Sequence, residues 1–165
     1  MIRYATLFIF TIMIFIIFNL MIYQKQKLLK SGETIYFSIT PSDPRSIMQG
    51  DYMTFRYKLE NDLKNANDKV SDKKGYVVIA FDDKSVGHFV RFYQGEQLAP
   101  NERLLRFRHR LQGGYRIQPN TFFFQEKLQP YFQQAEYAIF HYNGDKNYLL
   151  VGLANKNKER IEPQQ

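Results

Sequence analysis

Cysteine and tryptophan are both missing from this chain of 165 residues. Without cysteine, the protein has no disulfide, no thiolate metal site and no cysteine nucleophile. This absence does not assign a compartment, because many exported bacterial domains also lack cysteine. The aromatic residues are 12 tyrosines and 15 phenylalanines, and this bias favours β-strands. The length suits one domain with an appendage.

Signatures of phosphate, nucleotide and metal binding are also absent. The chain has no GxxxxGK[ST] phosphate loop and no GxGxxG after a predicted strand. The histidines His88, His109 and His141 fall on separate predicted strands. Asp82-Asp83 is a turn pair with too few oxygen ligands nearby for a calcium loop. We therefore expect neither a cofactor nor a metal.

Residues 5–22 carry no charged side chain. A helix of eighteen residues is about 27 Å long, close to the thickness of the hydrocarbon core. Tyr4 and Tyr23 flank the segment as interfacial anchors would. A signal peptide would have a shorter apolar region and a small-x-small cleavage site, which the exit NLMIYQKQK lacks. We predict a transmembrane anchor over residues 1–23 and a polar stem over 24–33.

The flanks of this segment give a weak indication of its orientation. Lys25, Lys27 and Lys30 follow the segment, whereas Arg3 and the α-amino group precede it. By the positive-inside rule, this difference of one charge favours a cytoplasmic domain.

Residues 34–154 predict a mainly β (α+β) domain, a barrel- or sandwich-like antiparallel fold with one short helix. Turn signals at Gly113-Gly114 and Asn143-Gly144-Asp145 separate alternating apolar runs. We predict a polar loop over 60–75 that has room for a turn of helix but lacks a core face. We also predict a helix within 125–136 that Pro130 interrupts or delays, and a frayed polar tail over 155–165. The expected strands are 34–40, 51–59, 76–82, 86–93, 103–112, 115–119, 121–124, 137–142 and 147–153.

One predicted strand carries a basic face. Arg106, Arg108 and Arg110 alternate with apolar residues and share one side. The net charge of +7 also suggests anionic neighbours, although ordinary solubility and the membrane flank explain it equally well. Nucleic acid is not expected, because Phe107 points away from the arginines instead of interleaving with them. An anionic lipid- or glycan-binding strand remains one alternative, and a solvated face is the other.

The stretch PSDPRSIMQGDYMTFRY (41–57) raises the question of an active site. Each residue has a structural use: Asp43 can cap a turn, Gly50 can take a positive φ, and Asp51 can accept backbone N–H bonds. An enzymatic alternative also exists. Ser42 precedes Gly50-Asp51 by a spacing similar to that of signal-peptidase-like serine hydrolases.

That alternative requires a general base, and the sequence argues against one. The segment 88–95 resembles the strand that carries the catalytic lysine in such enzymes, but Arg91 stands in its place. Arginine does not give up its proton near neutral pH, so it does not activate a serine. A signal-peptidase-like fold without activity stays open.

GDYMTFRY (50–57) resembles the motif of the bacterial GDYXXLXY family, with Phe55 in place of the leucine. The resemblance continues in GGYRIQPNTFFFQE (113–126), at Tyr131, and in LLVGL (149–153). It implies a small protein of the bacterial inner membrane with its domain outside the cytoplasm, working with a multi-pass membrane protein. We give this more weight than the one-charge argument for the opposite orientation.

We therefore predict a non-enzymatic binding or scaffolding domain on a single-pass anchor. Two adjoining loop surfaces would carry the binding, and the second lies where the predicted helix meets the strand 121–124. Their candidate residues are Asp43, Arg45, Gly50, Asp51, Tyr52 and Tyr57 on the first surface, and Glu126 and Tyr131 on the second. The resemblance supplies no catalytic residues.

Overall fold

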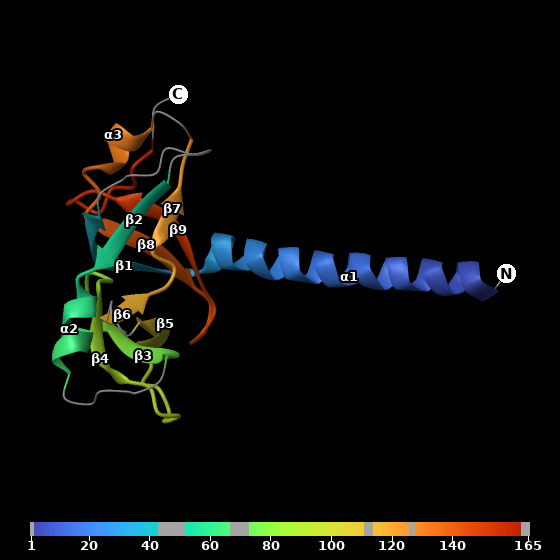
Figure 1. The fold of residues 1–165 in the computed structure, drawn as a ribbon, viewed down its shortest axis with the longest axis horizontal. Helices are drawn as coiled ribbons and strands as arrows, with labels where there is room; N and C mark the ends of the chain where they lie inside the picture. The colour runs from blue at the N-terminus through green and yellow to red at the C-terminus, as the bar shows by residue number, and fades with distance from the viewer. Residues whose placement is uncertain (1, 43–51, 67–72, 111–113, 126–127, 163–165) are drawn as a thin grey trace.

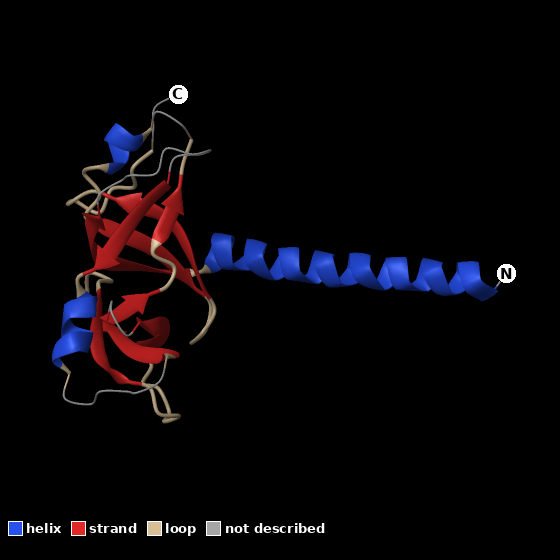
Figure 2. Cartoon of the chain, viewed as in Figure 1, coloured by secondary structure: helices blue, strands red, loops and turns tan. Residues whose placement is uncertain are grey.

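The structure is a computed structural model that describes residues 2–42, 52–66, 73–110, 114–125 and 128–162. A single long helix projects from a β domain, as Figures 1 and 2 show. The helices are α1 (Ile2–Ser31), α2 (Leu59–Asn65) and α3 (Gln129–Phe132). The strands are β1 (Glu33–Ser42), β2 (Tyr52–Tyr57), β3 (Lys74–Phe81), β4 (Gly87–Phe92), β5 (Glu102–Arg110), β6 (Gly114–Ile117), β7 (Thr121–Phe123), β8 (Tyr137–Tyr142) and β9 (Tyr148–Ala154).

The strands form two antiparallel sheets over one core. The larger sheet has the order β7-β2-β1-β8-β9 and the smaller has the order β4-β3-β5-β6. Phe37 of the larger sheet packs edge-on against Phe140 with ring centroids 5.1 Å apart, and Val77 and Phe107 of the smaller sheet join the same cluster. Each such buried side chain stabilises the fold by about 1.5–3 kcal/mol. The predicted mainly β, antiparallel architecture is confirmed.

Helix α1 continues without a break into the β domain. It includes the predicted stem up to Ser31, so this part of the chain is helical. Leu28 is 0% exposed, and the ring Nδ1 of His141 on β8 lies 3.1 Å from the carbonyl oxygen of Leu29, to which it donates. A Cβ on Gly32 would lie 2.5 Å from the Leu28 oxygen and 2.8 Å from the His141 Cβ, so only glycine fits. The last turns of α1 are therefore packed onto the domain.

The prediction of a loop without a core face over 60–75 is wrong for its first part. Helix α2 begins at Leu59 and buries both Leu59 and Leu63, which lie one turn apart on one face. Glu60 is also buried, because its carboxylate pairs with Arg116 at 3.0 Å and accepts the N–H of Ile117 at 3.0 Å. The helix thus covers the outer edge of β6. Two short helices, not one, follow the anchor in the described residues.

The predicted turns are confirmed where the structure describes them. Gly144 takes φ +79° in the β8–β9 turn and Gly114 takes φ +65° at the start of β6. Helix α3 starts late, with Pro130 in its first turn. The prediction of a frayed tail is wrong as far as residue 162. Asn155 organises a turn, and Arg160 bridges back to Ala154 at the end of β9.

Candidate functional site

The described flanks of the two motif segments lie side by side. Tyr52, the residue after Gly50-Asp51, pairs with Phe123 across β2 and β7. Their ring centroids are 5.8 Å apart. Phe123 is 73% exposed although it is a large apolar residue. The pairing gives an aromatic surface at the outer edge of the five-stranded sheet, because β7 is the last strand on that side.

Helix α3 packs against the residues on either side of Phe123. Phe132 is buried against Phe122 and Phe124, with ring centroids 5.5 and 4.8 Å away. Phe122 therefore faces the core, while its neighbour Phe123 faces outward, as strand alternation requires. Tyr131, next to Phe132, is 42% exposed. We call Tyr52, Phe123 and Tyr131 the aromatic edge.

The remaining candidates from the two motif segments divide into two groups. Tyr57 is 1% exposed, and its hydroxyl donates to the carbonyl oxygen of Pro119. Burial raises the pKa of Tyr57 well above its ordinary value. Tyr57 therefore belongs to the core and does not line a surface. The other predicted residues lie outside the described residues: Asp43, Arg45, Gly50, Asp51 and Glu126.

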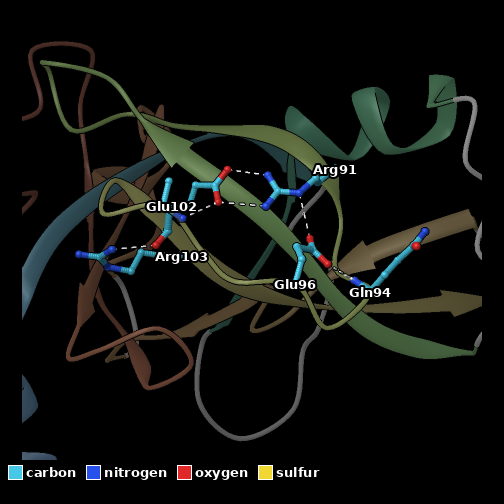
Figure 3. A network of polar contacts seen from close by, with 6 residues as sticks. Arg91, Gln94, Glu96, Glu102 and Arg103 are labelled. Atoms are coloured by element: carbon cyan, nitrogen blue, oxygen red, sulfur yellow. Dashed lines mark hydrogen bonds and ion pairs between the residues drawn. The ribbon is translucent and has the colours of Figure 1, made fainter.

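A network of ion pairs holds the long connection between β4 and β5, as Figure 3 shows. The Arg91 guanidinium makes two bonds to Glu102, at 2.5 and 3.0 Å, and a third to Glu96 at 2.9 Å. Glu102 also accepts the N–H of Ala99, and Glu96 accepts that of Gln94. The bonds from Arg91 and Ala99 lower the pKa of Glu102 to about 2. These five hydrogen bonds tie the connection to Arg91 on β4 and Glu102 on β5.

A surface groove of about 540 Å³ opens beside this network, between the β4–β5 connection and the β8–β9 turn. The N–H of Leu104 donates to the Asp145 carbonyl oxygen at 2.8 Å and holds the turn against β5. The Lys146 ammonium lies over the rings of Tyr76 and Tyr93, 5.6 and 5.3 Å from their centroids. The groove carries both acidic and basic side chains, so its charge does not select one class of ligand.

The hydrolase alternative gains no support from the described geometry. Arg91 is held by two carboxylates, and the bonds that it donates to Glu102 raise its pKa further. It is therefore even less able to act as a base than a free arginine. Ser42 ends β1 in the five-stranded sheet, whereas Arg91 lies on β4 in the other sheet. In the described ranges, no group of three or more His, Cys, Asp and Glu side chains is arranged to hold a metal.

The basic strand face is present as predicted from the alternation. Arg106, Arg108 and Arg110 are exposed on β5, and Lys74 and Arg116 lie beside Arg108 in register on the neighbouring strands. Arg116 is paired with Glu60. Glu33, just after α1, binds Arg103, so β5 begins next to the end of the helix. At about 3.4 Å per residue, Arg110 lies roughly 24 Å from Arg103 along β5.

Comparison with known proteins identifies the family. A family model described as GDYXXLXY protein matches residues 14–153. The chain belongs to the GDYXXLXY family. Neither a curated protein nor a solved structure matches it. For this family member, the match covers α1 from its middle onward and all strands of the domain except the last residue of β9.

Two features of this GDYXXLXY protein were not found from its sequence. Phe123 was hidden within TFFF, although alternation along a strand would have separated it from its neighbours. His141 was read as a scattered strand histidine, and nothing local indicates its bond to α1, 112 residues away.

Proposed function

We propose that this GDYXXLXY protein is a membrane-anchored binding domain whose partner is a multi-pass protein of the same membrane. The anchor is α1, whose segment Thr6–Ser31 is long and apolar enough to cross a bilayer and whose apolar window of 18 residues has none of its residues buried in the domain. No small-x-small site follows it, and Leu28 fills a position in the domain. These observations favour a retained anchor over a cleaved leader.

The aromatic edge is the proposed binding surface. Partly exposed aromatic side chains supply most of the energy at many protein interfaces, because they bury a large area at low entropic cost. The observation that carries this proposal is the pairing of Tyr52 with Phe123, since it joins the flanks of both motif segments. Asp43, Arg45, Gly50, Asp51 and Glu126, which belong to those segments, complete the proposed surface.

The domain is proposed to lie outside the cytoplasm, on the outer side of a bacterial inner membrane. The family resemblance supports this side, whereas Lys25, Lys27 and Lys30 favour the other. The side of the membrane can be tested with Lys156→Cys, because Lys156 is exposed. If the domain lies outside the cytoplasm, a thiol reagent that does not cross membranes labels this cysteine in intact cells. The chain has no cysteine of its own, so the labelling is unambiguous.

Site-specific photocrosslinking tests the binding surface. A photoreactive amino acid at Phe123 is expected to capture a membrane protein in native membranes. The matched control is Val90, an apolar residue of the other sheet that is 43% exposed. If the photoreactive residues at Phe123 and Val90 crosslinked the same proteins, the crosslinks would reflect random collisions and not binding at the aromatic edge. This result would contradict the proposal.

An anionic glycan is the second candidate ligand, and the basic face of β5 is the surface proposed to bind it. Lys74 adds a fourth cation beside Arg108. Binding that requires Arg106 and Arg108 and weakens steeply with salt would support this function. Binding unchanged by salt would exclude it.

A further inference from the structure

Asn19 places an amide in the apolar part of α1. Its Nδ2 donates to the carbonyl oxygen of Phe15, one turn earlier, at 2.8 Å. This single bond leaves the Oδ1 oxygen and the second N–H of the side chain without a partner in the described residues. The side chain is exposed on the helix surface. Tyr23 lies four residues later, so Asn19 is about 6 Å inside the interfacial anchor.

In hydrocarbon there is no water to satisfy these groups. Polar side chains such as Asn within membrane helices therefore bond to neighbouring helices and hold them together. The structure contains no second apolar helix of spanning length in its described part, so the neighbour must come from another chain. This step rests on the proposed membrane anchor.

Gln26 places a second amide on the same stripe of the helix. It follows Asn19 by seven residues, which at about 100° per residue returns it to within roughly 20° of the same direction. A shallow groove runs along this side, lined by Ile12, Phe15, Ile16, Asn19, Leu20 and Tyr23. Gln26 lies between Lys25 and Lys27, beyond Tyr23, so it extends the stripe into the membrane interface while Asn19 is the amide within the apolar segment. A polar residue within an apolar stripe, with a second one heptad later, is the pattern of a helix pair with polar positions in its seam.

The β domain leaves this stripe uncovered in the described residues. Leu28, the helix residue buried in the domain, is nine residues from Asn19. Nine residues turn the helix by about 900°, so the two side chains point in opposite directions. The helix therefore uses one side to hold its own domain and keeps the amide side for the membrane.

We propose that α1 pairs with a second copy of itself, in parallel, through Asn19 and Gln26. The chemistry favours a second copy because the free groups of a carboxamide, one N–H and one oxygen, are complementary to those of an identical carboxamide. Two copies inserted in the same orientation are parallel, so each amide meets its equivalent at the same depth. A polar residue at one seam position also fixes the register of such a pair.

Disulfide crosslinking of the full chain in native membranes tests this pairing. The natural chain has no cysteine, so single cysteines report only on the chosen position. Ile12→Cys lies on the amide stripe, about 20° from Asn19, and Ile17→Cys lies about 160° from Asn19 on the helix. Mild oxidation is expected to give a crosslinked dimer of twice 19.7 kDa. The yield of this dimer is expected to be at least five-fold higher for Ile12→Cys than for Ile17→Cys.

Asn19→Val in the Ile12→Cys background is expected to reduce the dimer several-fold, and Asn19→Gln to preserve it. Thr11→Val is the matched control, because the Thr11 hydroxyl already bonds to the Leu7 carbonyl oxygen. Equal crosslinking from both cysteines, no effect of Asn19→Val, or crosslinks only to a different protein would each overturn the proposal. Alkaline extraction separates the two claims: release from the membrane refutes the anchor, and retention without the dimer refutes only the pairing.

Discussion

Tyr52 and Phe123 face each other across β2 and β7, with their ring centroids 5.8 Å apart. They are separated by 71 residues in the chain, yet each lies within one of the two motif segments, 50–57 and 113–126. A large apolar ring that is 73% exposed at a sheet edge contributes little to folding. Its exposure next to Tyr52 is the observation on which the proposed binding surface rests.

The junction between α1 and the domain is expected to depend on packing at Leu28. Leu28→Ala removes a fully buried side chain and should lower the free energy of unfolding by about 2–4 kcal/mol. Leu29→Ala is the control, because that side chain is exposed and its carbonyl bond to His141 is kept. Urea unfolding of the full chain in detergent micelles, followed by circular dichroism, measures both. Equal losses from the two variants would contradict the packed junction.

The last tyrosine of the GDYMTFRY motif is expected to act in folding. Tyr57→Phe keeps the buried ring but removes the hydroxyl that donates to Pro119, so the Pro119 oxygen loses a partner. The expected cost is about 1–2 kcal/mol in the free energy of unfolding. Tyr52→Phe, at a half-buried position of the same motif, should change it by less than about 0.5 kcal/mol. A costly Tyr52→Phe with a neutral Tyr57→Phe would reverse these assignments.

Acid should weaken the fold through Glu102. Its pKa is about 2 in the folded protein against 4.5 ordinarily, so the unfolded chain binds the proton more readily. The contribution of Glu102 is therefore complete above pH 4.5 and is lost as the pH falls toward 2. Glu102→Gln should lower the free energy of unfolding at pH 7 and make it change less with pH between 4.5 and 2. Glu136→Gln, at an exposed position, should leave the pH dependence of the free energy of unfolding as it is in the natural protein. If Glu102→Gln left this pH dependence unchanged, groups other than Glu102 would be responsible for it.

The strands could be predicted because each is a local pattern. The alternation in 103–112 gave the arginine face of β5, and Asn143-Gly144-Asp145 gave the β8–β9 turn. The face of α2 was missed because only Leu59 and Leu63 mark it. Burial of its polar neighbour Glu60 becomes acceptable only when Arg116, 56 residues later, supplies the opposite charge.

The candidate surface was only partly predictable for the same reason. The motifs pointed to Tyr52 and Tyr131, and alternation along 51–59 places Tyr52 and Tyr57 on opposite faces of the strand, as their burial confirms. The alternation does not tell which residues lie on the neighbouring strands, and the pairing of β2 with β1 and β7 supplies this. The exposure of Phe123 likewise follows from its place on the last strand of the sheet, which no local pattern specifies.

The most direct test of the binding account is co-purification of the full chain from native membranes after crosslinking. The variants are Tyr52→Ala/Phe123→Ala and the control Val90→Ala, compared with the natural protein at matched abundance and with circular dichroism to show that each is folded. We predict that a multi-pass membrane protein is recovered with the natural protein and with Val90→Ala, and at least ten-fold less with Tyr52→Ala/Phe123→Ala. Equal recovery with all three proteins would contradict the account and leave the aromatic edge without a role in binding.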